Sequence, residues 1–259
     1  MVVVMTATNK LVVVVTGDPP AQVRQEHGGS ADMIRRAVGA SWRGEYIDVD
    51  PRAASARQLA ELTGSTDGIP AGGPAAILIT GSAASVTADE PWMAQTAAWL
   101  REVVKRGIPT FGICFGHQLL ARALGGAVCP NPAGHEIGTC SVEGRGQDPL
   151  FAGAPPSFGA NCFHADTVSA PPAGATVLAT SAMDAHQCLR FAEGCYGVQF
   201  HPEFDGPVMA SLITARRSFV EAAGLSATQL RDRARDTPKG RRVLQRFVET
   251  FASHRSLVS

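Results

Sequence analysis

Apolar runs alternate with amphipathic segments through the first half of the chain. Leu11–Thr16 is an unbroken aliphatic and β-branched run, typical of a strand buried on both faces of a parallel sheet. After a turn, the pattern predicts a helix over Ser30–Val38 with Ser30 as its N-cap. The same alternation predicts strands over Glu45–Val49, Ala75–Thr80 and Pro109–Ile113, and helices over Ala54–Leu62, Glu90–Lys105 and Phe115–Leu124.

This alternation of strands and helices predicts an α/β fold with a doubly wound, mostly parallel sheet. Ligands bind such sheets beyond the carboxyl ends of the strands, and both Gly81-Ser82 and Cys114 directly follow a predicted strand. Between residues 127 and 199 the apolar runs are short and separated by Pro and Gly. They predict a short antiparallel portion, including a hairpin through Leu189–Phe191 and Tyr196–Phe200, and the remaining chain is expected to be helical.

The composition is that of an ordinary globular protein, with 45% hydrophobic and 18% charged residues among 259. Twenty-three basic residues balance 23 acidic ones, so no overall field attracts nucleic acid or an anionic membrane. The apolar start, Met1 to Val15, lacks the basic region and cleavage site of a signal peptide, and Val12–Val15 is too short to cross a bilayer. We therefore expect a cytoplasmic protein with neither a nucleic-acid nor a membrane partner.

None of the six cysteines forms a CxxC pair, so neither a zinc knuckle nor a redox dithiol is indicated, and we expect no metal and no cofactor. Cys114 differs from the others because Gly112 and Gly116 flank it between a predicted strand and a predicted helix. This is the layout of a nucleophile elbow, in which the N–H groups at the start of the helix favour a thiolate. On these residues alone, a buried core thiol is an equal alternative.

A cysteine nucleophile needs a base, usually a histidine held by a third group. His201 follows the apolar run Tyr196–Phe200, and Glu203 stands two residues further on. Side chains at i and i+2 of an extended chain point to the same side, so Glu203 can meet one imidazole nitrogen of His201. Taken alone, the segment His-Pro-Glu also fits a surface turn.

Two segments together are more specific than either alone. Gly112–Gln118, Gly-Ile-Cys-Phe-Gly-His-Gln, and Gly197–Phe204, Gly-Val-Gln-Phe-His-Pro-Glu-Phe, closely resemble the two signatures of class I glutamine amidotransferases. The resemblance implies a flavodoxin-like fold, with Cys114 as nucleophile, His201 as general base and acid, and Glu203 as the group that orients it. It covers roughly residues 10 to 215.

The same resemblance extends to the expected oxyanion hole and substrate pocket. The segment ending in Gly81-Ser82 matches a family loop that supplies a backbone N–H, although Ser82 and Ala83 replace the commoner Gly-Pro. The second N–H would come from Phe115. Gln118 matches a glutamine that contacts substrate, and the segment containing His164 and Asp166 resembles one that lines the glutamine pocket, where a merely structural role is an equal alternative.

The implied domain organisation is a ragged N-terminus over 1–9, an amidotransferase domain over 10–215 and a helical extension over 216–259. Asp89-Glu90-Pro91-Trp92 resembles stand-alone members related to the amidotransferase half of GMP synthase. The chain contains no Walker-type GxxxxGK[ST] loop. If the chain is an amidotransferase subunit, the synthetase that accepts the ammonia is expected to be a separate polypeptide.

The resemblance implies a substrate, L-glutamine or a γ-glutamyl compound, and a Cys-His-Glu glutaminase or amidotransferase reaction. A γ-glutamyl peptidase with the same triad is the first alternative, and a non-catalytic regulatory protein on the same fold is the second. A thiol protein with a similar elbow cysteine is a third, which the His-Pro-Glu segment disfavours.

Overall fold

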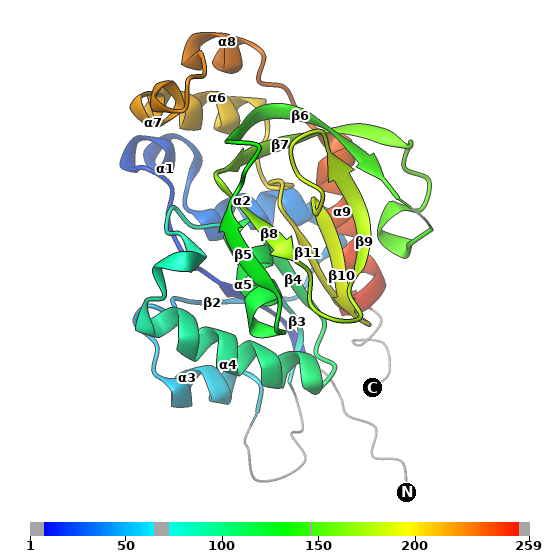
Figure 1. Ribbon diagram of the computed structural model, residues 1–259. Helices are drawn as coiled ribbons and strands as arrows, with labels where there is room; N and C mark the ends of the chain where they lie inside the picture. Colours follow the sequence, from blue (N-terminus) through cyan, green and yellow to red (C-terminus); the bar gives the residue numbers. More distant parts are fainter. Residues whose placement is uncertain (1–7, 65–72, 146, 254–259) are drawn as a thin grey trace, which may run out of the picture.

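In the computed structural model, residues 8–64, 73–145 and 147–253 are described. Within them, nine strands form one sheet whose order is β2-β1-β3-β4-β11-β10-β9-β6-β7 (Figure 1). The first five are parallel to one another and follow the order of doubly wound, flavodoxin-like sheets. They are β2 (Glu45–Val49), β1 (Thr8–Val14), β3 (Pro74–Ile79), β4 (Thr110–Ile113) and β11 (Cys195–Val198).

The antiparallel strands continue the same sheet rather than forming a separate one. The predicted hairpin joins β10 (Cys188–Ala192) to β11, and β9 (Thr176–Ser181), β6 (Glu136–Gly144) and β7 (Ser157–His164) follow at the edge. A two-stranded sheet is formed by β5 (Ala127–Pro130) and β8 (Asp166–Ala170). The predicted α/β fold with a mostly parallel sheet and an antiparallel portion is confirmed.

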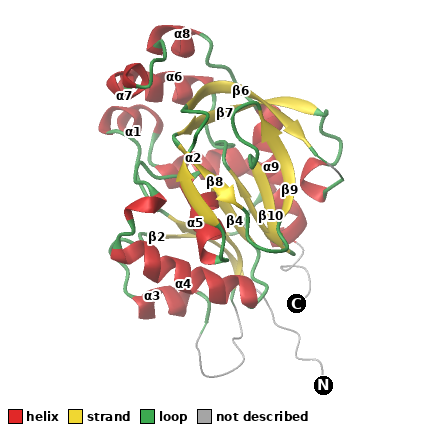
Figure 2. Cartoon of the chain, in the orientation of Figure 1, coloured by secondary structure: helices red, strands yellow, loops and turns green. Residues whose placement is uncertain are grey.

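Helices cover both faces of the sheet (Figure 2), and the strands separate two cores. Leu11 and Val13 of β1 belong to one buried cluster, whereas Val12 and Val14 belong to the other, as the two-residue period of a strand requires. The first cluster is covered by α2 (Ser30–Val38) and α9 (Pro238–Phe247). The second is covered by α3 (Ala56–Leu62), α4 (Pro91–Lys105) and α5 (Phe115–Ala123).

A group of short helices lies at one end of the molecule, near the carboxyl ends of the parallel strands (Figure 1). Apolar residues of α6 (Gly206–Ala215) pack with those of α7 (Arg217–Ala222) and α8 (Ala227–Asp232), and on another side with α1 (Ala21–His27). Helix α1 was not predicted, because Val23 is its one buried residue and leaves no apolar period to detect.

The strand and helix bounds agree with the sequence prediction within two residues, apart from β1, which begins earlier and ends at Val14. The predicted N-cap of α2 is wrong. Gly29 occupies that position, and its N–H donates to the Asp32 carboxylate at 3.0 Å. The Ser30 hydroxyl instead donates to the carbonyl of Gly17 at 2.8 Å, which ties the start of α2 to the loop after β1.

The chain after α6 remains largely helical and contributes to the main core. Val243, Leu244 and Phe247 of α9 are buried in the same cluster as β1 and β4 residues. Residues 1–7 of the predicted ragged terminus and 254–259 of the predicted extension lie outside the described residues, and the division at 215/216 stays a prediction. Among the described helices, none has the length and apolar character needed to span a membrane.

Candidate active site

Three adjacent parallel strands end at the same edge of the sheet and carry the predicted site residues. Gly81 and Ser82 follow β3, Cys114 follows β4, and His201 comes shortly after β11. These residues meet in one pocket, although long stretches of sequence separate them. Parallel strand order therefore brings the two sequence signatures together.

Cys114 sits in a sharp turn between β4 and α5. Its φ of 50° and ψ of −102° are strained for a residue with a side chain, and its N–H donates to the carbonyl of Val198 at 2.8 Å. A Cβ atom on Gly112 would lie 2.5 Å from the backbone of Gly116, and one on Gly116 would lie 2.7 Å from the carbonyl oxygen of Ile79. Both glycines are therefore required for the close approach of strand, turn and helix.

His201 is held from three directions. Its Nδ1 lies 2.8 Å from Glu203 Oε1, its backbone N–H donates to the Asn161 carbonyl at 2.7 Å, and its ring stacks on Phe204 with centroids 4.1 Å apart. Burial lowers the pKa of His201, but the charges and hydrogen bonds of Glu203 and Cys114 outweigh burial and raise the pKa to about 10. The site thus favours an imidazolium between a carboxylate and a sulfur.

Asn161 links this strand end to more distant parts of the chain. Its side-chain amide donates to the carbonyls of Phe204 and Arg235, at 2.9 and 3.2 Å, and its side-chain oxygen accepts from the Thr139 hydroxyl at 2.7 Å. The residue is fully buried. Strand β7, the turn after His201 and the segment before α9 are therefore joined through one side chain.

Gln199 contacts the sulfur, a role that the sequence analysis missed. Its Nε2 donates to Cys114 Sγ at 3.4 Å, and its Oε1 accepts from Gln118 Nε2 at 3.0 Å. Gln118 Nε2 also donates to the backbone carbonyl of Asp166 at 3.0 Å. Gln199 stands two residues before His201, so strand alternation was the available signal that both side chains face the same side.

His164 is buried and uses both ring nitrogens. Nδ1 donates to the Asp166 carbonyl at 3.0 Å, and Nε2 lies 3.0 Å from Glu136 Oε2, which also accepts from Gln187 Nε2 at 2.5 Å. His164 therefore lies beside the pocket with its polar atoms occupied by protein groups. The Asp166 carboxylate accepts from the Ser85 hydroxyl at 2.5 Å.

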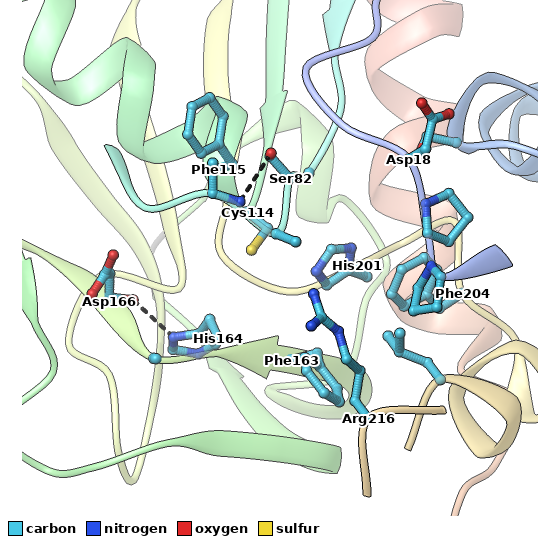
Figure 3. Close-up of a pocket in the computed structure, with 18 of the residues that line it drawn as sticks. Asp18, Ser82, Cys114, Phe115, Phe163, His164, Asp166, His201, Phe204 and Arg216 are labelled. Carbon is cyan, nitrogen blue, oxygen red and sulfur yellow. Dashed lines mark hydrogen bonds between the residues drawn. The ribbon is translucent and has the colours of Figure 1, made fainter. Parts of the chain in front are cut away.

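The pocket has a volume of about 440 Å³ and opens over Cys114 (Figure 3). It contains every predicted site residue: Gly81, Ser82, Cys114, Phe115, Gln118, His164, Asp166, His201 and Glu203. As the first residue of α5, Phe115 has a backbone N–H without an intrahelical acceptor. A Cβ atom on Gly81 would lie 2.8 Å from His201 Cε1, so a glycine here allows the loop after β3 to approach the imidazole.

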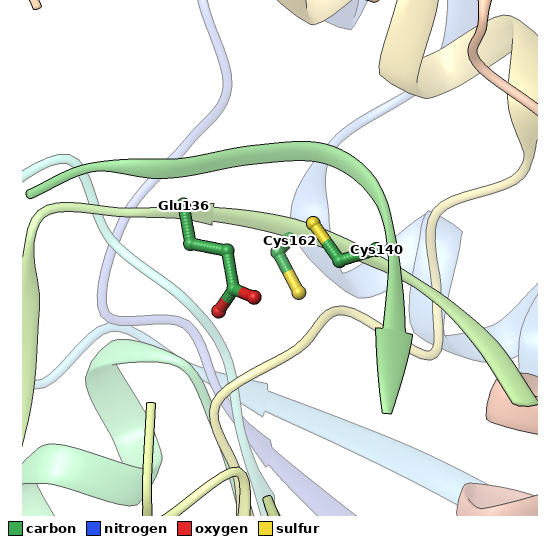
Figure 4. A group of neighbouring side chains, drawn as sticks. All are labelled: Glu136, Cys140 and Cys162. Atoms are coloured by element: carbon green, nitrogen blue, oxygen red, sulfur yellow. The ribbon is translucent and has the colours of Figure 1, made fainter. Parts of the chain in front are cut away.

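Glu136, Cys140 and Cys162 form a group whose ligand-type atoms lie within 4.8 Å of one another (Figure 4). The Glu136 carboxylate already accepts hydrogen bonds from His164 and Gln187. A hydrogen bond with Cys140, together with burial, raises the pKa of Cys162 well above its ordinary value. Both features oppose metal binding, which needs a free carboxylate and a thiolate.

The family model and the related sequences agree on one family. Residues 41–217 match the model of the glutamine amidotransferase class-I family. The glutamine-hydrolysing GMP synthase of Thermomicrobium roseum is 37% identical over 155 residues, which cover 60% of this chain and 28% of that protein. A glutamine amidotransferase-like protein of Schizosaccharomyces pombe is 31% identical over 144 residues, covering 55% of this chain and 58% of that protein. The chain thus spans less than two thirds of the length of these curated relatives.

Solved structures share the fold at lower sequence identity. A glutamine amidotransferase of Thermotoga maritima superposes with a TM-score of 0.69 and 23% identity, covering 93% of this chain and 98% of that one. A glutamine amidotransferase of Methylobacillus flagellatus gives a TM-score of 0.60 and 20% identity, covering 98% and 94%.

Proposed function

Because the chain belongs to the class I glutamine amidotransferase family, we propose that Cys114, His201 and Glu203 hydrolyse the side-chain amide of L-glutamine to glutamate and ammonia. The observation that carries this proposal is the buried pair of His201 and Glu203, 2.8 Å apart, beside the sulfur of an elbow cysteine. This arrangement has the geometry of a nucleophile, a base and an orienting carboxylate.

The first step is attack of the Cys114 thiolate on the amide carbonyl carbon of glutamine. The raised pKa of His201 supports an imidazolium that stabilises the thiolate. Glu203 holds the far ring nitrogen, which fixes the ring orientation and stabilises the positive charge. Gln199 donates to the sulfur and helps to hold it in place.

Negative charge then develops on the carbonyl oxygen. The backbone N–H groups of Ser82 or Gly81, together with that of Phe115, are proposed to bind it. Loss of one such donor typically lowers the rate by about 10²–10³-fold. Because these donors belong to the backbone, replacing the commoner Gly-Pro by Ser82 and Ala83 leaves the hydrogen-bonding groups in the chain.

The carbon–nitrogen bond breaks as His201 gives its proton to the departing ammonia, leaving a γ-glutamyl thioester on Cys114. His201 then removes a proton from water, which attacks the thioester and releases glutamate. Gln118, His164 and Asp166 are proposed to shape the side of the pocket that receives the glutamyl group. No metal or organic cofactor enters these steps.

The ammonia acceptor is proposed to be a separate synthetase. The chain aligns with 28% of the Thermomicrobium protein named a glutamine-hydrolysing GMP synthase, and the sequence contains no Walker-type GxxxxGK[ST] loop. A cytoplasmic location is proposed with it, because the chain has balanced charge and its described helices cannot span a membrane.

The test is glutamate release from L-glutamine by the purified chain and by Cys114→Ala. Release that depends on Cys114 is the expected result. If no release is seen, labelling with a glutamine-analogue electrophile separates two cases: labelled Cys114 indicates a subunit that needs its partner. An unlabelled Cys114 would contradict the proposal and favour a non-catalytic regulatory protein.

A further inference from the structure

The two sides of the pocket are chemically different, and the proposed reaction assigns a role to each. The acid that protonates the leaving nitrogen must lie within hydrogen-bond reach of it. The leaving group therefore departs on the His201 side of Cys114, and the glutamyl group lies on the opposite side. In Figure 3, Asp166 and His164 lie on one side of Cys114, and His201, Phe204 and Arg216 lie on the other.

The His201 side has an apolar lining that ammonia does not require. Phe204 stacks on His201, and the Phe163 and Phe219 rings stack with centroids 5.9 Å apart. Leu212 of α6 and Met33 of α2 complete the apolar wall. The whole pocket, about 440 Å³, falls in the range of roughly 300–1,000 Å³ that is typical of sites for larger organic ligands.

One cation lines this apolar side. Arg216 lies between α6 and α7, is half-buried, and extends toward His201 in Figure 3. Within the described residues, its guanidinium has no ion pair and no side-chain hydrogen bond. Its neighbour Arg217 instead pairs with Glu221 at 2.9 Å. Asp18 also lines the pocket, but its carboxylate lies 3.4 Å from Arg52.

An arginine that faces a pocket without a protein partner is suited to binding a carboxylate of the ligand, often through two parallel hydrogen bonds. We propose that the His201 side binds the amine half of a γ-glutamyl amide whose leaving amine is a hydrophobic α-amino acid. The apolar wall receives its side chain, and Arg216 binds its carboxylate. This proposal rests on the proposed Cys114 chemistry and defines its substrate class.

The same bonds form and break as in the hydrolysis of glutamine. Cys114 forms the thioester, the carbon–nitrogen bond to the amino acid breaks, and His201 gives its proton to the leaving amine. Water then releases glutamate. Only the leaving group is larger, and ammonia from glutamine is the smallest member of the series.

The experiment compares kcat/KM for γ-glutamyl-phenylalanine, γ-glutamyl-glycine, γ-glutamyl-phenethylamide and glutamine. The phenethylamide retains the ring and lacks the carboxylate, whereas the glycine compound retains the carboxylate and lacks the ring. For wild type, kcat/KM for γ-glutamyl-phenylalanine should exceed kcat/KM for the phenethylamide and for the glycine compound by about tenfold or more. Arg216→Gln should lower kcat/KM for γ-glutamyl-phenylalanine by about 10–100-fold. The values of kcat/KM for the phenethylamide and for glutamine should stay within about threefold of those of wild type.

Arg217→Gln is the matched control, because Arg217 is exposed and pairs with Glu221, and it should change none of these values. Equal effects of Arg216→Gln on all four substrates, or a wild-type preference for glutamine, would overturn the proposal while leaving the Cys114 chemistry intact. Loss of all turnover and of electrophile labelling in wild type would instead contradict the proposed function.

Binding to Cys114→Ala, measured by calorimetry, tests the subsite without turnover. γ-Glutamyl-phenylalanine should bind, and adding Arg216→Gln should weaken its affinity by about tenfold or more. Absence of binding, or affinity unchanged by Arg216→Gln, also counts against the proposed subsite.

Discussion

Two buried histidine–carboxylate pairs lie near the pocket, and they are arranged for different tasks. His201 and Glu203 are 2.8 Å apart, and His164 and Glu136 are 3.0 Å apart. The second ring nitrogen of His164 donates to a backbone carbonyl, whereas His201 interacts with Cys114. Both nitrogens of His164 contact groups that take no part in the proposed reaction, whereas His201 contacts the proposed nucleophile and can exchange a proton with the reacting atoms. The comparison teaches that pairing with a carboxylate alone does not define a base.

The two pairs also differ in how the chain creates them. His201 and Glu203 are two residues apart in the segment after β11, so local geometry brings them together. Glu136 and His164 are opposite each other in the antiparallel pairing of β6 with β7. The first pair could be predicted from a short motif, whereas the second depends on strand register, which no local pattern specifies.

The largest expected difference between the pairs is in turnover. His201→Gln should lower kcat for glutamate release by about 10⁴–10⁶-fold, because it removes the proposed base and acid. His164→Gln should lower kcat by less than about tenfold, because both nitrogens of His164 already serve structural contacts. Steady-state kinetics on well-folded proteins checks this, and equal losses in kcat would contradict the distinction.

The next largest difference is expected when the carboxylate of each pair is replaced. Glu203→Gln is expected to lower kcat by about 10³–10⁴-fold and to lower the pKa of His201, because the ring loses its negative partner. The measurements are steady-state rates and an NMR titration of the His201 ring. Glu136→Gln serves as the control. If its effect on kcat matched that of Glu203→Gln, the assignment of the orienting group would be wrong.

The pair of His164 and Glu136 should contribute to stability. Glu136→Ala leaves His164 and Gln187 without their buried acceptor and should lower the free energy of unfolding by about 3–5 kcal/mol. Urea unfolding measures this change. Glu143→Ala is the matched control, since Glu143 is exposed on the same strand and should change stability by less than about 0.5 kcal/mol. Comparable losses in both variants would argue against a structural role of the pair.

A third buried histidine extends the comparison to a ring without a carboxylate. Burial lowers the pKa of His117 to about 3, from 6.5. The unfolded chain therefore binds a proton below pH 6.5 that the folded protein excludes. Stability is fully present above pH 6.5 and falls at lower pH, by about 2 kcal/mol between pH 6.5 and about pH 5.

Urea unfolding of wild type and His117→Gln at several pH values measures this effect. The wild type should show the steeper loss of stability on acidification. Parallel curves for the two proteins would show that His117 does not contribute. The comparison uses slopes, so any loss of packing in His117→Gln does not affect the conclusion.

Particular helices, strands and site residues show which parts of the molecule could be predicted from the sequence. Strand β2 and helix α2 were predicted with correct bounds, because turn-forming residues mark their ends. Helix α1 could not be predicted, because it is held by packing against α6 rather than by a pattern of its own. The family signatures allowed Cys114 and His201 to be predicted as parts of one site. The contact of Gln199 with the sulfur and the position of Arg216 depend on tertiary packing, so the signatures did not reveal them.

The hydrogen bonds of Asn161 determine which parts of the protein unfold together. Its side chain joins β7 to Phe204 and Arg235, and its carbonyl binds the N–H of His201. Breaking these bonds together would release the strand end and the segment leading to α9 in one cooperative event. Hydrogen exchange of the His201 amide should therefore report the unfolding of the C-terminal helices, and a chain shortened before Arg235 should exchange there much faster.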